Sequence, residues 1–308
     1  MAQLTPMMQQ YMEVKNQNKD AILFYRLGDF YEMFFDDAKT ASRELELALT
    51  GRDCGLEERA PMCGVPYHSA EGYIARLIQK GYKVAICEQM EDPALAKGLV
   101  KREVIRTVTP GTVIEASMLN ESENNYIASV YEHEEGMAVA FCDLSTGEMS
   151  ATLTDAKGLA AELSRFGPKE LVLCRDALKN ASVRAFLDSG SSCLVENVDE
   201  SRFDYPSALD IVNEQVGSGM DLSKAPRAVI SACGGLLDYL HETQKSHLEH
   251  ISFINIYSGE QFMQLDFNAR RNLEPVSYTH LDVYKRQSLC CAKGEGDEKD
   301  NFDSRQHI

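Results

Sequence analysis

In residues 1–110, the spacing of apolar positions changes repeatedly between that of a buried strand and that of an amphipathic helix. The run 21–27 is apolar apart from one arginine and predicts a buried strand, as do 83–88 and 104–108. Helices are predicted over three further segments, 7–15, 33–49 and 70–80. Strands that alternate with helices in this way predict an α/β domain built on a mixed sheet.

Small and polar residues predict where these elements begin and end. Thr5 and Ser69 precede helical segments and are expected to cap them, with Pro6 at the first helical position. Gly28 and Asp29 are expected to turn the chain between the first strand and the helix that begins at residue 33.

The pattern after residue 112 predicts a second domain. Residues 113–125 are predicted to form a linker, because most of this stretch is polar. Short alternating segments with polar turns between them predict an antiparallel meander of three strands, over 126–131, 137–143 and 148–154. An α/β layer is expected to follow, with a helix over 156–166, a strand over 170–174 and a helix over 226–243 that has Pro226 at its first position.

Composition limits the class of protein. With 308 residues and 44% hydrophobic content, the chain can form two or three compact domains. No apolar run approaches the roughly 20 residues of a membrane span, and the start lacks a secretion signal, so a soluble cytoplasmic protein is expected. The nine cysteines form no Cys-x-x-Cys pair, which predicts reduced thiols without a zinc site or a disulfide framework.

The net charge of −17 argues against a general nucleic-acid binder, because phosphate contacts need Lys and Arg. The acidic excess is uneven along the chain. Residues 1–110 carry 14 Lys and Arg against 16 Asp and Glu, and the remaining 198 residues carry 17 against 32. The first segment is therefore nearly neutral and can supply only modest affinity for a phosphate backbone.

Residues 28–35 are the best candidate for function, because they hold four aromatic side chains around Glu32. An aromatic ring such as Phe30, followed two positions later by an acid, can wedge between base steps and hydrogen-bond a displaced base edge. Four aromatics in eight residues are also typical of a protein core, so composition alone leaves both interpretations open.

The context of this cluster resembles the MutS family of DNA mismatch-recognition proteins. The motif Phe-Tyr-Arg-Leu-Gly-Asp-Phe-Tyr-Glu occupies 24–32, and five further family-like stretches occur in order, at 4–11, 64–68, 84–89, 108–112 and 268–274. The resemblance implies that Phe30 stacks on a mispaired base from the minor groove and that Glu32 hydrogen-bonds that base. It also implies possible DNA contacts for Leu27 and Arg106, for which a core leucine and a solvated surface arginine are the alternatives.

The same resemblance implies a domain plan. It comprises a mixed-sheet mismatch-recognition domain (1–112), the linker, a ribonuclease-H-like connector domain (126–255) and the start of a helical core (256–274). The full-length family is a DNA-dependent ATPase that uses ATP and Mg²⁺, acts as a homodimer and works with MutL. No Gly-x-x-x-x-Gly-Lys-Ser/Thr motif occurs in this chain, so we expect a fragment that is not an enzyme and has no cofactor. We also expect this fragment to be monomeric by itself, and its partner to be duplex DNA with a mismatch or small loop.

The resemblance is expected to stop at residue 274. Residues 276–287 back-translate to an inverted DNA repeat that resembles two transposase mosaic ends of a sequencing adapter joined head to head. Residues 288–308 are polar and have almost nothing to bury, which predicts a disordered tail. We therefore interpret 275–308 as a non-native junction and tail.

Two other functions are compatible with a ribonuclease-H-like fold. A metal-dependent nuclease would place an Asp on the first hairpin, where Asp143 lies, but two-metal catalysis needs several converging carboxylates, and no convincing partners follow in the sequence. A turn-forming Asp is the simpler interpretation. Alternatively, the second domain serves only as a protein-interaction module, whose acidic surface would suit a basic partner.

Overall fold

The computed structural model describes residues 4–91, 98–120, 123–189, 192–217, 220–245 and 248–258. All of these ranges belong to one compact unit. The predicted core segment after residue 258, and the predicted junction and tail at 275–308, lie outside the described residues.

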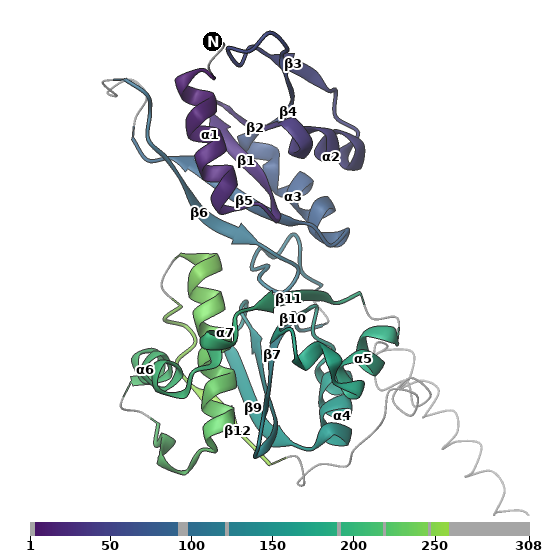
Figure 1. Cartoon of the computed structure of the whole chain (residues 1–308), viewed down its shortest axis with the longest axis vertical. Helices are drawn as coiled ribbons and strands as arrows, with labels where there is room; N and C mark the ends of the chain where they lie inside the picture. The colour runs from purple at the N-terminus through teal and green to yellow at the C-terminus, as the bar shows by residue number, and fades with distance from the viewer. Residues whose placement is uncertain are drawn as a thin grey trace, which may run out of the picture. The chain divides into compact units, whose positions relative to one another are not determined.

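The first six strands form a mixed sheet in the order β3-β4-β2-β1-β5-β6, and we call the part of the chain that contains this sheet the first domain (Figure 1). Its strands are β1 (Ala21–Leu27), β2 (Phe30–Phe34), β3 (Thr50–Arg52), β4 (Ala60–Pro66), β5 (Lys83–Gln89) and β6 (Arg102–Val108). Its helices are α1 (Pro6–Gln17), α2 (Phe35–Leu45) and α3 (Ala70–Gln79). The pair β1–β5 is parallel and the other pairs are antiparallel, which confirms the predicted mixed sheet.

Alternation along β1 divides the core of this domain into two layers. Leu23 and Tyr25 point to the face that packs against α1, and Ile22 and Phe24 point to the face that packs against α2 and α3. Because both faces of β1 are covered, the strand is apolar at nearly every position, as the sequence predicted.

The predicted helix over 33–49 is wrong at both ends. Met33 and Phe34 belong to β2 and pair with β4, and the helix begins only at Phe35. At these two positions, pairing with the neighbouring strand determines the structure, although the apolar spacing is that of a helix. The helix ends at Leu45, and Glu46 takes a left-handed conformation with φ +59°. The end of a helix depends on such a backbone feature, which apolar spacing alone does not predict.

The predicted helix caps are corrected in the same domain. Pro6 lies at the first turn of α1, as predicted, but the Thr5 side chain makes no capping hydrogen bond. Ser69 makes none either, because it closes the 3-10 turn Tyr67–Ser69 and its hydroxyl donates to the Pro66 carbonyl at 3.2 Å. Both residues lie before a helix but do not satisfy its free N–H groups.

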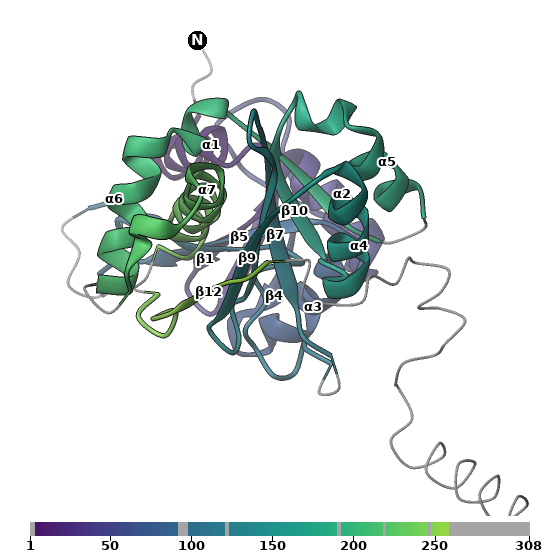
Figure 2. The ribbon, with the colours of Figure 1, turned by 90° about the horizontal axis from the view of Figure 1, so that it is seen from below.

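The second domain has a six-stranded sheet in the order β11-β10-β7-β8-β9-β12. Its strands are β7 (Tyr126–His133), β8 (Gly136–Asp143), β9 (Glu148–Thr154), β10 (Glu170–Cys174), β11 (Leu194–Val198) and β12 (Ile254–Ile256), and its helices are α4 (Ala156–Phe166), α5 (Ala181–Asp188), α6 (Tyr205–Val216) and α7 (Arg227–Gln244). The antiparallel pairs β7–β8 and β8–β9 confirm the predicted meander. Helices α6 and α7 lie on one face of the sheet and α4 and α5 on the other (Figure 2).

Helix α7 is buried along most of its length, from Ala228 to Gln244, and it packs against the meander and α6. The sequence predicted Pro226 as the first helical residue of α7, but Pro226 is the N-cap residue and the helix begins one position later, at Arg227. In the part of the chain that the structure describes, no helix combines the length and the apolar character needed to cross a membrane.

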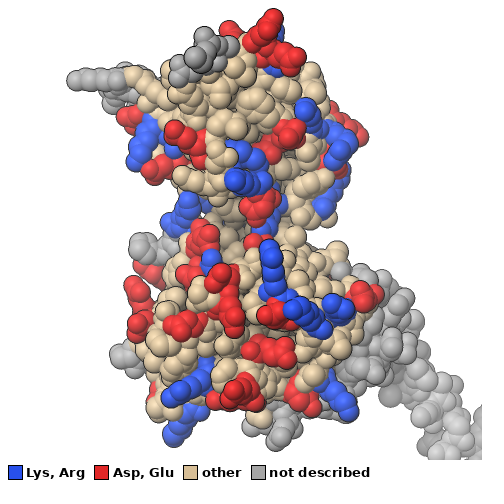
Figure 3. Space-filling model, viewed as in Figure 1, with Lys and Arg blue, Asp and Glu red and all other residues tan. Residues whose placement is uncertain are grey.

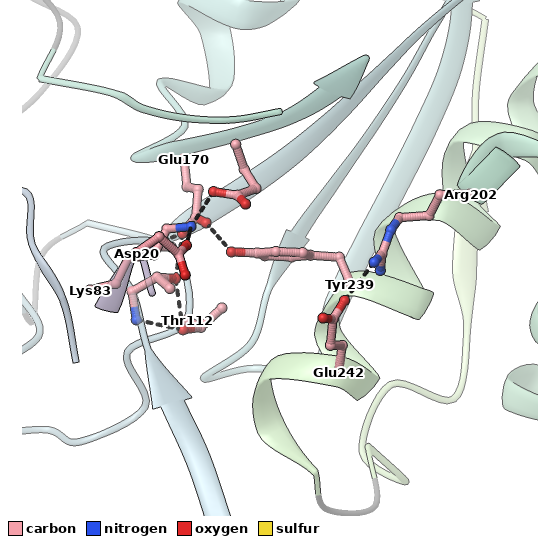
Figure 4. Close-up of polar contacts among 10 residues, drawn as sticks. Asp20, Lys83, Thr112, Glu170, Arg202, Tyr239 and Glu242 are labelled. Atoms are coloured by element: carbon pink, nitrogen blue, oxygen red, sulfur yellow. Dashed lines mark hydrogen bonds and ion pairs between the residues drawn. The ribbon is translucent and has the colours of Figure 1, made fainter. Parts of the chain in front are cut away.

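A buried carboxylate joins the end of β6 to the second domain (Figure 4). Glu170 is fully buried, and it accepts hydrogen bonds from the Thr109 hydroxyl, from the Gly111 N–H at 3.0 Å and from the Tyr239 hydroxyl at 2.6 Å. Burial raises the pKa of Glu170, although these three donors oppose the shift. A Cβ on residue 111 would lie 2.7 Å from the Glu170 Cβ, so glycine is required for this close approach.

A second polar contact joins the two domains beside this carboxylate. The Lys83 ammonium at the start of β5 pairs with Asp20 at 2.6 Å and with Glu196 on β11. Burial alone would lower the pKa of Lys83, but the hydrogen bonds to the two carboxylates outweigh it, and the pKa is raised. Lys83 therefore stays charged between two acids.

Candidate nucleic-acid interface

Phe30 begins the second strand of a tight hairpin. Leu27 and Phe30 are directly paired across β1 and β2, which leaves Gly28 and Asp29 as a two-residue turn. Gly28 has φ +58°, the positive value that a primed hairpin turn requires at its first position. The sequence predicted this turn, and the structure shows that it leads into a strand.

The strand separates the aromatic residues of the cluster into exposed and buried sets. Tyr31 and Phe34 are in the core, as the alternative interpretation of the cluster expects, whereas 46% of the Phe30 surface is exposed. Phe30 and Glu32 are two positions apart on β2, so their side chains point to the same face of the sheet. A large exposed ring and a carboxylate therefore lie next to each other at the tip of a hairpin.

Glu32 is held by an ion pair with Arg52 on β3. The Glu32 side chain is 15% exposed and the Arg52 side chain 37%, and they are the two members of a short hydrogen bond. The carboxylate that would meet a base thus has a cationic partner in the free chain. Sequence reasoning missed Arg52, because the pair joins residues on different strands that no local motif connects.

Leu27 and Arg106, the two further candidates for DNA contact, lie at different places. Leu27 is half-buried beside Phe30 and packs against the α1 side of the core. Arg106 is on β6, the edge strand that β1 and β5 separate from β2, so it lies away from the hairpin tip. The structure brings Leu27 next to the wedge candidate and places Arg106 apart from it.

Arg106 is mostly buried and engaged, which corrects the alternative of a solvated surface arginine. Its side chain is 15% exposed, pairs with Glu115 and donates to the Thr112 carbonyl at 3.0 Å. These contacts close the loop that follows β6. A contact with a DNA backbone would require this guanidinium to rearrange.

Asp143, the candidate metal ligand, is a turn-forming residue in the structure. Its carboxylate accepts from the Ser145 N–H at 2.9 Å, from the Ser145 hydroxyl at 2.7 Å and from the Asn125 N–H at 3.1 Å. Within the described ranges, no group of three or more His, Cys, Asp or Glu side chains is arranged to hold a metal ion. The carboxylate geometry therefore favours the turn interpretation over the nuclease interpretation.

All seven cysteines in the described residues are free thiols, and burial raises the pKa of Cys87 and of Cys233 to about 12.

On the face of the molecule that Figure 3 shows, Lys and Arg side chains are interspersed with Asp and Glu over both domains. This face offers no broad basic surface for a DNA backbone.

Comparison with known protein families gives two matches along the chain. A family model described as MutS domain I matches residues 5–117, and one described as MutS domain II matches residues 125–252. The first match contains the hairpin with Phe30 and Glu32. The second contains the meander and the helices packed on it.

Similar proteins include three that are named DNA mismatch repair protein MutS. The protein of Acetivibrio thermocellus is 51% identical over 293 residues, which is 94% of this chain and 34% of that protein. The proteins of Ruminiclostridium cellulolyticum and Clostridium tetani are 50% and 49% identical, over 94% and 93% of this chain and 33% and 32% of theirs. The chain thus spans about a third of the length of these relatives.

An alignment over 94% of the chain includes residues past Glu274, the predicted limit of the resemblance. Three Clostridium botulinum relatives align over 88% of the chain. The adapter-derived origin of the segment after Glu274 stays a prediction.

Proposed function

This chain belongs to the MutS family, and from that premise we propose that its first domain recognises mismatched or unpaired bases in duplex DNA to initiate mismatch repair. The observation that carries the proposal is the exposed Phe30 ring at the hairpin tip, with the Glu32 carboxylate on the same face. The proposed mechanism consists of binding alone, and no covalent bond is formed or broken.

In this mechanism Phe30 enters the minor groove and stacks on a displaced base. Unstacking a step of ordinary duplex costs a few kcal/mol, and an apolar wedge offsets this cost by its own contacts. A mismatch lowers the cost, because its pairing and stacking are already weakened. The preference for mismatched DNA then arises because a mismatched duplex costs less energy to deform than a matched one.

Glu32 adds a hydrogen bond to the displaced base. A carboxylate accepts when ionised and donates when protonated, so one side chain can serve different mismatches. In the free chain Arg52 neutralises this charge. When Glu32 turns to a base, the Arg52 guanidinium becomes available to a nearby phosphate, which would limit the repulsion between the carboxylate and the DNA backbone.

The second domain has a connecting role in this proposal. Its buried contacts with the loop 109–112 hold it to the first domain, and the acidic excess outside residues 1–110 suits docking of a basic partner surface. The interaction-module interpretation is therefore compatible with mismatch recognition. A nuclease role is the weaker alternative, because the oxygens of Asp143 are occupied by N–H and O–H donors.

The remaining family properties are proposals for the longer protein of which this chain resembles about a third. They are ATP hydrolysis with Mg²⁺, dimerisation, cooperation with MutL and a cytoplasmic site of action. For the chain itself we propose a mismatched or looped duplex as the DNA partner, a clamp supplied elsewhere for much of the backbone affinity, and no cofactor.

The substitution Glu32→Gln tests the proposed role of the carboxylate. It removes the ion pair with Arg52 and one negative charge near the phosphates, so total affinity for duplex DNA is expected to rise by a few fold. The ratio of mismatched to matched affinity is expected to fall by about fivefold, because a neutral amide is a weaker acceptor than a carboxylate. Titrations of labelled duplexes, followed by fluorescence anisotropy at fixed salt, measure both quantities.

Glu57→Gln is the matched control, since it makes the same change of charge on an exposed loop of the same domain. It is expected to leave the ratio unchanged. The parent chain must itself bind the mismatched duplex more tightly than the matched one. Equal ratios for the Glu32→Gln chain and the parent would rule out a role for this carboxylate.

A further inference from the structure

The two-residue turn before Phe30 has both of its carbonyl groups bound by side-chain or backbone donors from outside the turn. The Arg26 Nε donates to the Gly28 carbonyl at 2.6 Å, and the Tyr67 N–H donates to the Asp29 carbonyl at 3.0 Å. Neither bond belongs to the ladder of β1 and β2. These two bonds hold the turn itself in place through its carbonyl groups.

The Arg26 guanidinium is in turn held from several sides. It lies over the Tyr67 ring, with 3.6 Å between its central carbon and the ring centroid, and it pairs with Glu88 on β5 at 3.1 Å. Glu88 also accepts from the Tyr31 hydroxyl, and burial together with this bond raises the pKa of Tyr31. The side chain is only 16% exposed, so the guanidinium is not a mobile surface group.

Register explains why this support lies beneath the wedge. Arg26 and Tyr31 are directly paired across β1 and β2, and Phe30 is paired with Pro66, the residue before Tyr67. Because side chains alternate along a strand, Tyr31 points away from the face that holds Phe30. The network of Arg26, Tyr67, Glu88 and Tyr31 thus supports the hairpin from the face opposite Phe30.

We propose that Arg26 and Tyr67 are positioning residues, which hold the Gly28–Asp29 turn so that Phe30 is placed for stacking before DNA arrives. This inference rests on the proposed function of Phe30. Nothing in it requires either residue to touch DNA. Arg26 holds the turn by its hydrogen bond to the Gly28 carbonyl. Tyr67 holds it by the hydrogen bond of its N–H to the Asp29 carbonyl, and the Tyr67 ring stacks on the Arg26 guanidinium.

The physical advantage is preorganisation. A free hairpin tip must lose conformational freedom when its ring enters a base stack, and ordering a side chain or loop on binding weakens affinity. The network removes this cost in advance, because the turn has no unbound carbonyl and little freedom to rearrange. An arginine suits the task, since its planar guanidinium can stack and donate at the same time.

A tryptophan at position 30 gives a reporter that needs no DNA. The chain has no tryptophan of its own, and Phe30 is exposed enough to accept a larger ring, so Phe30→Trp places the only tryptophan of the chain at the hairpin tip. Time-resolved anisotropy of the full chain then measures nanosecond motion at this position. Arg26→Lys keeps the charge but loses the planar group, and Tyr67→Ala removes the stacked ring.

Both substitutions are expected to increase the amplitude of fast depolarisation at position 30. Tyr67→Phe, which keeps the ring and the N–H, is expected to restore the value of the Phe30→Trp chain. Arg43→Lys is the matched control, because Arg43 is an exposed arginine on α2. Unchanged depolarisation in both the Arg26→Lys and the Tyr67→Ala chains would overturn the proposal. If Arg26→Lys fails to fold, judged by circular dichroism, the comparison of Tyr67→Ala with Tyr67→Phe decides it.

The DNA measurement separates this inference from the proposed function. With Phe30 restored, Tyr67→Ala is expected to lower the ratio of mismatched to matched affinity by about two- to tenfold, and Tyr67→Phe to preserve the ratio. Increased motion at position 30 together with no mismatch preference in the parent chain would support the positioning role and reject the wedge. Increased motion with a full mismatch preference in the Tyr67→Ala chain would overturn the claim that positioning serves recognition.

Discussion

The substitution Phe30→Ala is expected to abolish the preference of this chain for mismatched over matched duplex, while weak binding to any duplex persists. Stacking of a base on an aromatic side chain contributes about 1–3 kcal/mol, so removing the ring should lower mismatched affinity by roughly five- to 150-fold. Binding to matched duplex depends on phosphate contacts, which the substitution leaves in place. Anisotropy titrations with the two labelled duplexes measure the two affinities.

The exposure of Phe30 makes this substitution a clean test. Because 46% of its surface is already exposed, truncation should leave no large cavity, and the unfolding midpoint should change little. Leu56→Ala is the matched control, since Leu56 is a large apolar residue of the same domain that is 44% exposed. Full discrimination by the Phe30→Ala chain would show that another group reads the mismatch.

The substitution Glu170→Ala is expected to produce the second large effect, a loss of about 3 kcal/mol or more in the free energy of unfolding. It would leave three buried donors without their acceptor, on Thr109, Gly111 and Tyr239, and each such group costs about 1–3 kcal/mol. Urea unfolding of the full chain, followed by circular dichroism, measures the loss. A shift no larger than that of an exposed control such as Glu57→Ala would contradict the account.

Glu170→Gln separates the acceptor role of this residue from its charge. The amide keeps the size of the side chain and one acceptor oxygen, so the loss should be about 1 kcal/mol. The pKa of Glu170 is raised in the folded chain, so the folded state holds its proton more tightly than the unfolded state does. The stability that Glu170 contributes relative to Gln is therefore full below the unfolded pKa of 4.5 and falls as the pH rises through the folded pKa. A difference between the two chains that is constant with pH would contradict the raised pKa.

Local spacing was sufficient for the elements that are long or have regular turns. The meander of β7, β8 and β9 was predicted from alternation and short polar turns, and α4 and α7 were predicted from helical spacing. These segments bury residues at the period of their own geometry, so the sequence alone contains the signal.

Short strands were missed because their partners define them. The strand β3 has three residues, of which one is a glycine, and β12 also has three. The strand β3 exists through pairing with β4, which follows it after a loop, and β12 exists through pairing with β9, which is distant in sequence. Met33 and Phe34 show the same limit, since helical spacing assigned them to α2 and pairing with β4 assigns them to β2. Tertiary pairing can override local preference in each of these places.

The sequence was sufficient to identify the residues of the candidate site, but not the side chains that contact them. The family-like motif identified Phe30 and Glu32, and their two-residue spacing places them on one face once β2 is known to be a strand. The Arg52 partner of Glu32 comes from a distant part of the sequence, and so does the Tyr67 ring that stacks on Arg26. Such partners follow from strand order, which spacing along the chain does not encode.

The most direct test of the central claim is the emission of a tryptophan at position 30 when the Phe30→Trp chain binds DNA. The chain has no other tryptophan, so its emission reports contact with a base at this position alone. Our account predicts quenching on a duplex with one mismatch and little change on the matched duplex at equal saturation, which a label on the DNA measures. Equal emission on the two duplexes, with both bound, would contradict the claim that residue 30 stacks on the mispaired base.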